Sequence, residues 1–426
     1  MVTYGGDEVS ALVLDIGTSS VRAGYAGDDS PKAIIPTQYG FIPQENSQDV
    51  EMGENADSTE KHQDTRSFLG EAGPSLFRPG MQIGNPMNDS LIEDFGPISA
   101  LVRHALEDSM RVNPAEHPIL VTEPAWNTTE NRERMAEIMF EEFQVPAFYI
   151  ANTGVLNTFA AGKGTALVID VGQSVSSVIP VVDGFVLRKG VAYSNLPKLV
   201  HAHARHVLTG SNINLTPHQL IASKIPVESN TLPQFTVRED RIAGVTDSWR
   251  SWYEDRAVED WVQSVGGVLE QGWNDQLAMQ RPPRQYEFPT GYNTFFGADR
   301  YHVGELYFYH KPNLVASNPS LPKHIPALIS DSLRACDIEL RQVLMGNVVL
   351  TGGGSLFGGF ADRLHNELVR SFPHVKIHAP GNPTERRYGA WLGGSILASL
   401  GTFHQLWISK EEWMEHGKPI VTQRCK

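Results

Sequence analysis

Two stretches of the chain repeat one pattern of apolar runs around a small polar tip. Residues 11–27 read ALVLDIGTSSVRAGYAG, and residues 166–184 read ALVIDVGQSVSSVIPVVDG. In each stretch an aliphatic run ends near an aspartate, Asp15 or Asp170, and a glycine follows two positions later. Apolar strands joined by a small polar tip predict a β-hairpin. Because the plan occurs twice, we interpret the stretches as equivalent hairpins in two related halves. The expected strands are Ala11–Leu14 and Val21–Tyr25 around the tip 17–20, then Ala166–Ile169 and Val178–Val182 around the tip 172–177.

Two segments downstream of the first hairpin have the spacing of amphipathic helices. Apolar residues recur every three or four positions in Ile98–Met110 and Glu130–Phe143, which is the period of a helix with one buried face. In the second segment, Thr129 or Asn127 is expected to cap the start. The buried stripe of that helix is expected to consist of Met135, Ile138, Met139 and Phe143.

The last third of the chain has a strand, a glycine-rich turn and a helix in succession. The pattern predicts a strand at Asn347–Leu350, the turn TGGGSLFGG over 351–359, an amphipathic helix at Phe360–Ser371 and a strand near Val375–Ile377. A unit of this kind supplies the ligand-binding edge of an α/β sheet. The predicted fold class is therefore α/β.

Two segments look unusual at first but have ordinary explanations. Residues 197–283 mix helical and polar segments and include the run HAHARH. Because no acidic or cysteine partner lies at ligand spacing, we interpret this run as a helix in which His203 or His206 borders the core, not as a metal site. Trp391–Ile408 is strongly apolar but contains Ser, Thr, His and Gln, so a buried helix is expected instead of a membrane span.

Composition and charge narrow the class of protein. The chain has 426 residues, of which 41% are hydrophobic and 20% charged, the balance of a globular protein with two domains or one duplicated body. The net charge of −14 disfavours binding to nucleic acids and anionic membranes, so a DNA-linked role is expected to depend on protein partners. Cys336 and Cys425 are too few for a disulfide framework, which fits a reducing compartment. The N-terminal residues lack the features of a secretory signal.

Residues 41–66 form the most acidic part of the chain. They contain acids throughout and almost no large apolar side chains. Such a segment buries too little surface to offset the entropy lost on ordering. We interpret it as a mobile acidic loop inserted into the first half.

The three turns share a chemistry that suits a nucleotide. Turns that contain glycine direct backbone N–H groups at an anion, and the hydroxyls of Thr18, Ser19 and Ser20 add donors for phosphate. Asp15 and Asp170 are expected to face each other and to hold a hydrated Mg²⁺ ion, although an aspartate that merely caps a turn is the alternative for either hairpin alone. The third turn is expected to accept a flat base or ribose. Together the turns predict a nucleotide cleft between two lobes.

The chain resembles actin over nearly its whole length. The long ordered matches are ALVLDIGTSSVRAGYAGDDSPKA (11–33), EHPILVTEPAWNTTENRERMAEIMFEEFQVPAFYI (116–150) and ERRYGAWLGGSILASLGTFHQLWISKEEW (385–413). Within that superfamily the chain is most similar to the nuclear actin-related protein 4 class. The segments that carry this narrower resemblance are Tyr4–Val9 (YGGDEV), 123–132 (EPAWNTTENR) and Tyr286–Arg300 (YEFPTGYNTFFGADR). The match is weakest in residues 41–66 and 197–283.

The resemblance implies the actin and Hsp70 ATPase fold, a duplicated ribonuclease-H-like α/β fold with two lobes, four subdomains, ATP and Mg²⁺. The implied boundaries are 1–36, 86–160 and 389–426 for subdomain 1, 37–85 for subdomain 2 with the acidic loop 41–66, 161–196 and 284–388 for subdomain 3, and 197–283 for subdomain 4. The implied metal ligands, through water, are Asp15 and Asp170, and Gln263 and Ser264 are candidates for the adenine contacts of subdomain 4. The implied nucleotide-binding residues are Asp15, Gly17, Thr18, Ser19, Ser20, Arg22, Asp170, Gly172, Gln173, Ser174, Val175, Gly352, Gly353, Gly354, Ser355, Phe357 and Arg387.

The chain departs from actin at the positions that orient the attacking water. Thr153 stands where actin has Gln, and Ser177 stands where actin has His. Thr is too short for the first task, and Ser cannot relay a proton as an imidazole does near neutral pH. In addition, Gln173 and Ser174 replace Asp and Gly, and Arg22 replaces Lys. The sequence therefore predicts no catalytic residue and an ATP-binding protein with very slow or undetectable hydrolysis.

The resemblance also implies partners. The acidic residues 41–66 stand where actin has an apolar longitudinal contact, and like charges at such a contact oppose homopolymer formation. The expected state is a monomer that forms a heterodimer with actin on a helical segment of a large subunit, in a nuclear chromatin-remodelling or histone acetyltransferase complex. The apolar surface around Trp391–Trp407 is the expected contact. Histones or nucleosomes are further candidate partners, whereas a membrane and strong direct DNA binding are not expected.

Three alternative functions share the fold. A polymerising or slowly hydrolysing actin-like ATPase would need the water-positioning groups and an apolar loop in subdomain 2. A sugar or acetate kinase would need a catalytic base beside a second substrate pocket, for which the sequence offers no candidate. An Hsp70 chaperone would need a peptide-binding domain after the nucleotide lobes, and the chain is expected to be too short for one.

Overall fold

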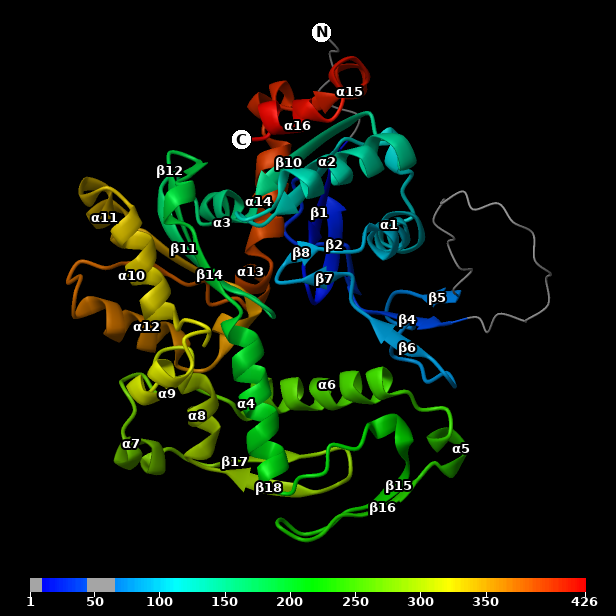
Figure 1. Cartoon of the computed structure of the whole chain (residues 1–426), viewed down its shortest axis with the longest axis vertical. Coiled ribbons are helices and arrows are strands. Elements are labelled where there is room, and N and C mark those ends of the chain that lie inside the picture. Colours follow the sequence, from blue (N-terminus) through cyan, green and yellow to red (C-terminus); the bar gives the residue numbers. More distant parts are fainter. Residues whose placement is uncertain (1–9, 44–65) are drawn as a thin grey trace, which may run out of the picture.

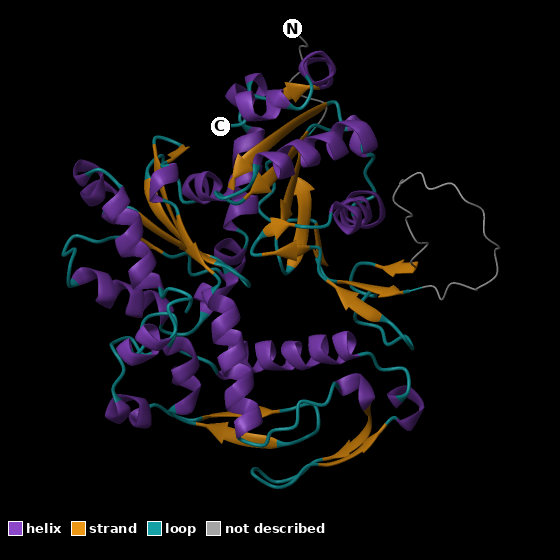
Figure 2. Ribbon diagram, viewed as in Figure 1, coloured by secondary structure: helices purple, strands orange, loops and turns teal. Residues whose placement is uncertain are grey.

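Two mixed sheets form the framework of the molecule, and helices pack around both (Figures 1 and 2). The computed structural model describes residues 10–43 and 66–426, and it confirms the α/β class. The first sheet has the order β21-β10-β9-β1-β2-β3, and the second has the order β13-β12-β11-β19-β20 with β14 paired to β12. The strands of the first sheet are β1 (Leu12–Ile16), β2 (Ser20–Tyr25), β3 (Ala33–Pro36), β9 (Ile119–Glu123), β10 (Ala147–Asn152) and β21 (Ile408–Ser409). Those of the second are β11 (Ala166–Val171), β12 (Ser176–Val182), β13 (Phe185–Val186), β14 (Ala192–Ser194), β19 (Val348–Thr351) and β20 (Ile377–His378).

The two predicted hairpins are confirmed and occupy equivalent places in the two sheets. β1 pairs antiparallel with β2 and parallel with β9, and β11 pairs antiparallel with β12 and parallel with β19. This repeated arrangement supports the interpretation of two related halves. The second tip is shorter than expected, because Ser176 and Ser177 belong to β12 and pair with Val171 and Asp170. The antiparallel ladder therefore continues past Asp170 to Val171, as the ladder of the first hairpin continues past Asp15 to Ile16.

Helices α1 (Phe95–Arg103) and α2 (Thr129–Glu137) confirm the two predicted amphipathic helices, and each continues into a π-helical segment, at His104–Ser109 and Ile138–Glu142. The stripe Met135, Ile138, Met139 and Phe143 is buried, as predicted. The expected caps Thr129 and Asn127 are wrong. Thr128 has the extended backbone of a capping residue and accepts a hydrogen bond from the backbone N–H of Asn131 at 3.2 Å, whereas Thr129 is already helical.

The chain passes between the two sheets twice, and the two crossings pack together. Helix α3 (Thr153–Ala160) connects β10 to β11, whereas α13 (Pro383–Arg387) and α14 (Gly389–Ser399) lead from the second sheet back to the first. Helices α3 and α14 touch closely at Gly393, where a Cβ atom would lie 1.9 Å from the carbonyl oxygen of Leu156. The apolar segment that begins at Trp391 is thus a buried helix followed by a short turn. In the described residues no helix has the length and apolarity needed to cross a membrane.

The last third of the chain follows the predicted succession of β19, a 3₁₀ turn at Gly353–Leu356, α12 and β20, with bounds shifted by one or two residues. The histidine run lies on α4, where His203 is partly buried and His206 is exposed. No group of three or more His, Cys, Asp or Glu side chains is arranged for a metal within residues 10–43 and 66–426. The remaining helices are α4 (Leu196–Gly210), α5 (Glu239–Ile242), α6 (Asp247–Val265), α7 (Asp275–Gln280), α8 (Asp299–Glu305), α9 (Pro312–Ser317), α10 (Ile325–Ala335), α11 (Ile338–Met345), α12 (Phe360–Val369), α15 (Lys410–His416) and α16 (Pro419–Arg424).

Small sheets complete the two lobes, and most of them lie away from the two crossings (Figure 1). Their strands are β4 (Tyr39–Ile42), β5 (Arg66–Phe68), β6 (Gln82–Gly84), β7 (Met87–Asn88), β8 (Leu91–Ile92), β15 (Ile221–Ile225), β16 (Gln234–Val237), β17 (Arg284–Glu287) and β18 (Asn293–Phe296). The predicted acidic loop is wrong at its ends, because Phe41, Ile42 and Arg66 form backbone ladders in β4 and β5. Residues 44–65, which hold the rest of that loop, and residues 1–9 lie outside the described residues.

Candidate functional site

The tips of the two main hairpins meet between the lobes. The hydroxyl oxygens of Thr18 and Ser174 lie 2.9 Å apart and share a hydrogen bond. The carbonyl oxygen of Thr18 accepts hydrogen bonds from the side-chain amides of Gln38 at 3.1 Å and Asn85 at 3.3 Å. The first tip is therefore held by neighbouring loops on one side and by the second tip on the other.

The two tips have the same turn geometry. The backbone N–H of Gly17 donates to the carbonyl of Ser20 at 3.0 Å, and that of Gly172 donates to the carbonyl of Val175 at 2.9 Å. In the described part of the chain, four backbone N–H groups of the tips donate no hydrogen bond: those of Thr18, Ser19, Gln173 and Ser174. Two adjacent turns with free N–H groups form a site with the donors that an oligophosphate needs.

The two predicted aspartates lie close enough to affect each other's charge. The carboxylate of Asp15 accepts a hydrogen bond from the Thr122 hydroxyl at 2.6 Å and forms an ion pair with the Arg22 guanidinium. The pKa of Asp170 is raised to about 6, mainly by burial and in part by the negative charge of Asp15, whereas the positive charge of Arg22 opposes the rise. The site therefore holds one acid that is neutralised by a fixed cation and one that is not.

The donor set around Asp170 fits a hydrated divalent cation. Among the described residues its carboxylate has no hydrogen-bond partner, and the uncompensated charge next to Asp15 is what a cation would neutralise. Mg²⁺ usually keeps several waters and binds proteins through few carboxylates. The residues present are therefore compatible with the predicted Mg²⁺, held through water by Asp15 and Asp170.

The third turn packs directly on the end of β11. Gly352 has φ +88°, a conformation that favours glycine, and a Cβ atom on it would lie 2.3 Å from Oδ1 of Asp170. A Cβ atom on Gly354 would lie 2.6 Å from the side chain of Val171. Ser355 is buried and donates its hydroxyl proton to the carbonyl of Gly352 at 2.7 Å. The glycines thus let bare backbone approach Asp170 and the end of β11.

The predicted adenosine residues are brought to the rim of this turn. Arg387 is exposed, and its Nε lies 3.7 Å from the Cβ position of Gly353. Phe357 is partly buried and packs edge-on against Tyr307, with ring centroids 5.8 Å apart, so its ring supports the turn from the core side. The end of α6 lies next to the same turn, because residues 267 and 358 form a β-bridge. There the exposed Gln263 donates a side-chain hydrogen bond to the carboxylate of Glu259 at 3.1 Å.

Ser264, the other adenine candidate, is also exposed at the end of α6, and its carbonyl accepts a hydrogen bond from Arg284 at 3.3 Å. Thr153 and Ser177, the residues expected to replace actin's water-orienting groups, lie on the elements next to the hairpin tips. Thr153 is the first residue of α3, which packs against β12 where a Cβ on Gly154 would lie 2.6 Å from Ile179. Ser177 is buried on β12 opposite Asp170. Neither hydroxyl titrates near neutral pH, so neither can serve as a general base.

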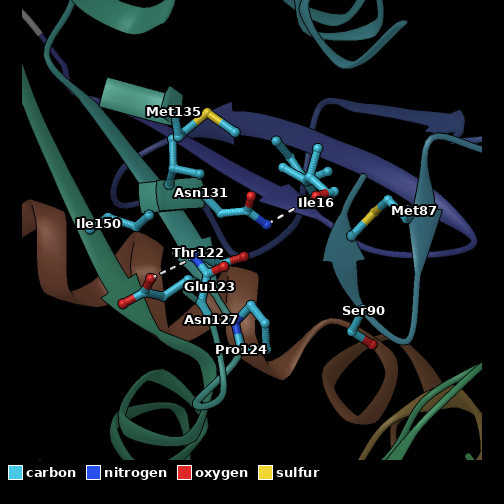
Figure 3. A pocket seen from close by; sticks show the side chains of 12 residues that line it. Ile16, Met87, Ser90, Thr122, Glu123, Pro124, Asn127, Asn131, Met135 and Ile150 are labelled. Atoms are coloured by element: carbon cyan, nitrogen blue, oxygen red, sulfur yellow. Dashed lines mark hydrogen bonds between the residues drawn. The ribbon is translucent and has the colours of Figure 1, made fainter. Parts of the chain in front are cut away.

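Several polar residues of the site were not identified from the sequence. Thr122 and Glu123 end β9, the strand parallel to β1, and the signal that was available is a polar pair at the carboxyl end of an apolar strand. Thr122, Glu123, Asn127 and Asn131 are among the residues that line a cavity of about 20 Å³ (Figure 3), a volume that suits one water. Burial raises the pKa of Glu123, although Arg132 and Asn127 oppose the rise.

Comparisons with known proteins agree on one family. The family model described as Actin matches residues 6–426. The chain is similar to proteins named "Actin-related protein 4" from three fungi, which it matches over nearly the full length of both chains. It is 39% identical to that of Emericella nidulans over 99% of this chain and 98% of the relative. It is 36% identical to that of Mycosarcoma maydis over 99% of both chains. It is 37% identical to that of Yarrowia lipolytica over 99% and 97%.

Proposed function

The chain belongs to the actin family, and we propose that it is a nuclear, ATP-binding and essentially non-hydrolysing structural subunit. In this proposal it pairs with actin on a helical segment of a large subunit of a chromatin-remodelling or histone acetyltransferase complex. The proposal rests on a contrast between the groups that would bind the nucleotide and the groups that would orient the attacking water. The N–H groups and acids that suit a nucleotide are in place, whereas Thr153 and Ser177 offer no base where water would be oriented.

Nucleotide binding is supported by the meeting of three turns. The first two turns present free N–H groups and share the hydrogen bond between Thr18 and Ser174, and the third places bare backbone against Asp170. ATP carries several negative charges, so binding beside Asp15 and Asp170 needs a counter-charge. Arg22 supplies one, and Mg²⁺ would supply the rest and would screen the phosphates when bound.

Weak hydrolysis follows from the chemistry of the two replaced positions. A positioned general base contributes about 10²- to 10⁴-fold to a rate, and the hydroxyls of Thr153 and Ser177 cannot accept a proton at neutral pH. Other groups, such as the bound cation, would still stabilise the transition state. The expected result is a residual rate far below that of actin and not a strict zero.

The partner surface is supported by apolar side chains near the C-terminus. Ile396, Leu400, Leu406 and Met414 are exposed to between 38% and 79% on α14, the turn after it and α15. Exposed apolar groups on neighbouring elements are typical of a protein-binding surface. We assign this surface to the helical segment of the larger subunit.

Two measurements test the proposal. Phosphate release from the purified protein loaded with ATP and Mg²⁺ should be far slower than from actin under the same conditions, and the ATP recovered after denaturation should be intact. Equal turnover would contradict the loss of hydrolysis. Leu406→Asp and Met414→Asp should abolish co-purification with the helical segment of the larger subunit without changing ATP binding. Sedimentation after addition of ATP would reveal a filament and would favour the polymerising alternative.

A further inference from the structure

A buried amide on the first crossing helix contacts the strand that leads into the third glycine turn. Asn157 lies on α3 and is 3% exposed, and Thr351 is the last residue of β19 and is 5% exposed. The hydroxyl oxygen of Thr351 lies 3.2 Å from Oδ1 of Asn157. The amide group of Asn157 also donates to the carbonyl of Thr153, the first residue of α3, at 2.8 Å. Because a polar group that is buried without a partner is costly, these bonds hold both side chains in place.

The same hydroxyl reaches the second crossing. The backbone carbonyl of Arg386, on α13, lies 2.9 Å from the hydroxyl oxygen of Thr351, and it also accepts a hydrogen bond from the backbone N–H of Gly352 at 2.9 Å. A hydroxyl has one proton, so Thr351 donates to Asn157 or to Arg386 at any one time and lies within hydrogen-bond distance of both. Through this carbonyl, the end of β19 and the start of the third turn are attached to α13.

Arg386 also holds the other end of the third turn. Its guanidinium donates to the carbonyl of Ser355 at 3.2 Å and to the carbonyl of Pro380 at 2.9 Å. Arg386 is partly buried, whereas Arg387, the residue expected near the adenosine, is exposed. Backbone groups at both ends of the turn, those of Gly352 and Ser355, are therefore attached to one residue of α13.

A glycine at the start of α14 makes room for these side chains. A Cβ atom on Gly389 would lie 2.4 Å from Oδ1 of Asn157 and 3.0 Å from the hydroxyl oxygen of Thr351. The φ angle of Gly389 lies outside the left-handed region, so its backbone conformation does not require glycine. The close approach of the Asn157 amide is therefore what excludes a side chain at the first residue of α14.

We propose that Asn157 and Thr351 are positioning residues of the nucleotide site, which hold the third turn in the orientation that accepts the base and ribose. The inference rests on the proposed function, because the third turn is the expected adenosine contact. Neither side chain is among the residues expected to touch the nucleotide. A turn that contacts its ligand through backbone atoms depends on the residues that fix that backbone. Loss of the two side chains therefore weakens binding although no group that contacts the ligand is removed.

The direct test removes both polar side chains and keeps their shapes. Leucine has the shape of asparagine and valine has the shape of threonine, so the double variant Asn157→Leu with Thr351→Val preserves the packing. Replacing both partners of a buried hydrogen bond by apolar groups of the same shape is nearly neutral for stability, whereas replacing one partner leaves the other unpaired. The carbonyl of Arg386 keeps its bond from Gly352. Thr351→Val alone is the destabilised comparison, and Thr351→Ser, which keeps the hydroxyl, is the matched control.

Three measurements separate positioning from folding. The Tm of the nucleotide-free protein reports stability, hydrogen exchange of the backbone amides at 352–355 in the same sample reports the turn, and calorimetric titration with ATP and Mg²⁺ reports affinity. We expect the double variant to keep the wild-type Tm, to lose protection at 352–355 and to bind ATP at least about tenfold more weakly, which corresponds to ~1.4 kcal/mol. Thr351→Ser should match the wild-type protein in all three measurements. Thr351→Val alone should lower the Tm and the affinity together.

The double variant decides the outcome. Wild-type affinity for ATP or unchanged protection at 352–355 in this variant would overturn the proposal. A Tm that falls as far as that of Thr351→Val would also overturn it, because the two side chains would then serve stability alone. If the wild-type protein binds no ATP, the proposed nucleotide function fails by itself. Loss of protection at 352–355 in the double variant at an unchanged Tm would then still support the positioning of the turn by Asn157 and Thr351, and retained protection would overturn it.

Discussion

Asp170→Asn removes a negative charge that the ligand-free site does not compensate. Burial raises the pKa of Asp170 from 3.8 to about 6, and the nearby charge of Asp15 contributes to the rise while Arg22 opposes it. Asparagine has nearly the same shape and no charge. We therefore expect the variant to be more stable than the wild-type protein at neutral pH when no nucleotide or Mg²⁺ is present.

The size and pH dependence of this effect follow from linkage. Well below pH 3.8 the carboxyl is protonated in both the folded and the unfolded chain, so its charge has no effect on stability. Between about pH 4 and 6 the Asp170 carboxyl is ionised in the unfolded chain but still protonated in the folded chain, so the free energy of unfolding of the wild-type protein falls as the pH rises. Above about pH 6 the carboxyl is ionised in both states, and the free energy of unfolding falls no further. A shift of roughly two pKa units corresponds to ~3 kcal/mol. With ~2.1 cal/mol/K of unfolding entropy per residue, that difference gives ~3 °C in Tm for a chain of 426 residues that unfolds as one unit.

Thermal unfolding of stripped protein in EDTA, measured from pH 4 to pH 8, checks this prediction. The Tm of Asp170→Asn should exceed that of the wild-type protein by ~3 °C at pH 7.5, and the difference should vanish near pH 4. Asp29→Asn, at an exposed position, is the control and should change nothing. Addition of ATP with Mg²⁺ should reverse the order, because only the wild-type protein keeps both acids for the hydrated cation. A Tm difference at pH 7.5 that is absent, negative or independent of pH would refute the reasoning.

Three further changes should act on different parts of the site. Arg22→Ala leaves the carboxylate of Asp15 buried without its cation, so it should lower the free energy of unfolding by ~3–5 kcal/mol and weaken ATP binding, as measured by thermal unfolding and by titration. Replacing Thr153 with Gln and Ser177 with His together should raise phosphate release by at least about tenfold, because a general base contributes ~10²- to 10⁴-fold; a rate equal to wild type would show that other groups block hydrolysis. Gly393→Ala places a methyl group 1.9 Å from a backbone carbonyl of α3 and should lower the Tm by several degrees, whereas a wild-type Tm would show that the crossings tolerate a shift.

The sequence predicted the parts of the fold that depend on local patterns. The hairpins at Asp15 and Asp170 were recognised because an apolar run, a glycine and a small polar tip lie next to each other in the chain. The helix that begins at Thr129 was recognised for the same reason, although its cap was misplaced by one residue because Asn127, Thr128 and Thr129 all have capping side chains. Local chemistry favours each of them, and the backbone direction at the helix entrance selects Thr128.

The parts that sequence reasoning missed depend on contacts between distant segments. Thr122 reaches Asp15 only because β9 lies parallel to β1, and no pattern near Thr122 indicates that partner. Met81 and Trp249 lie far apart in the chain and belong to different lobes. Both are buried because the two lobes contact each other there. Such contacts need the register of the sheets and the angle between the lobes, and neither can be read from local periodicity.

Arg22 connects the nucleotide site to the crossings between the lobes. Its guanidinium pairs with Asp15 and lies over the ring of Tyr388, 5.0 Å from the ring centroid, and Tyr388 directly precedes α14. A lysine could neutralise the same acid, but an ammonium group lacks the plane that stacks on an aromatic ring while it donates to a carboxylate. The arginine therefore fixes the first turn to the element about which the lobes are joined. A nucleotide bound at the turns would therefore contact a loop that is tied through Arg22 to the crossing between the lobes, which is consistent with the proposed structural role.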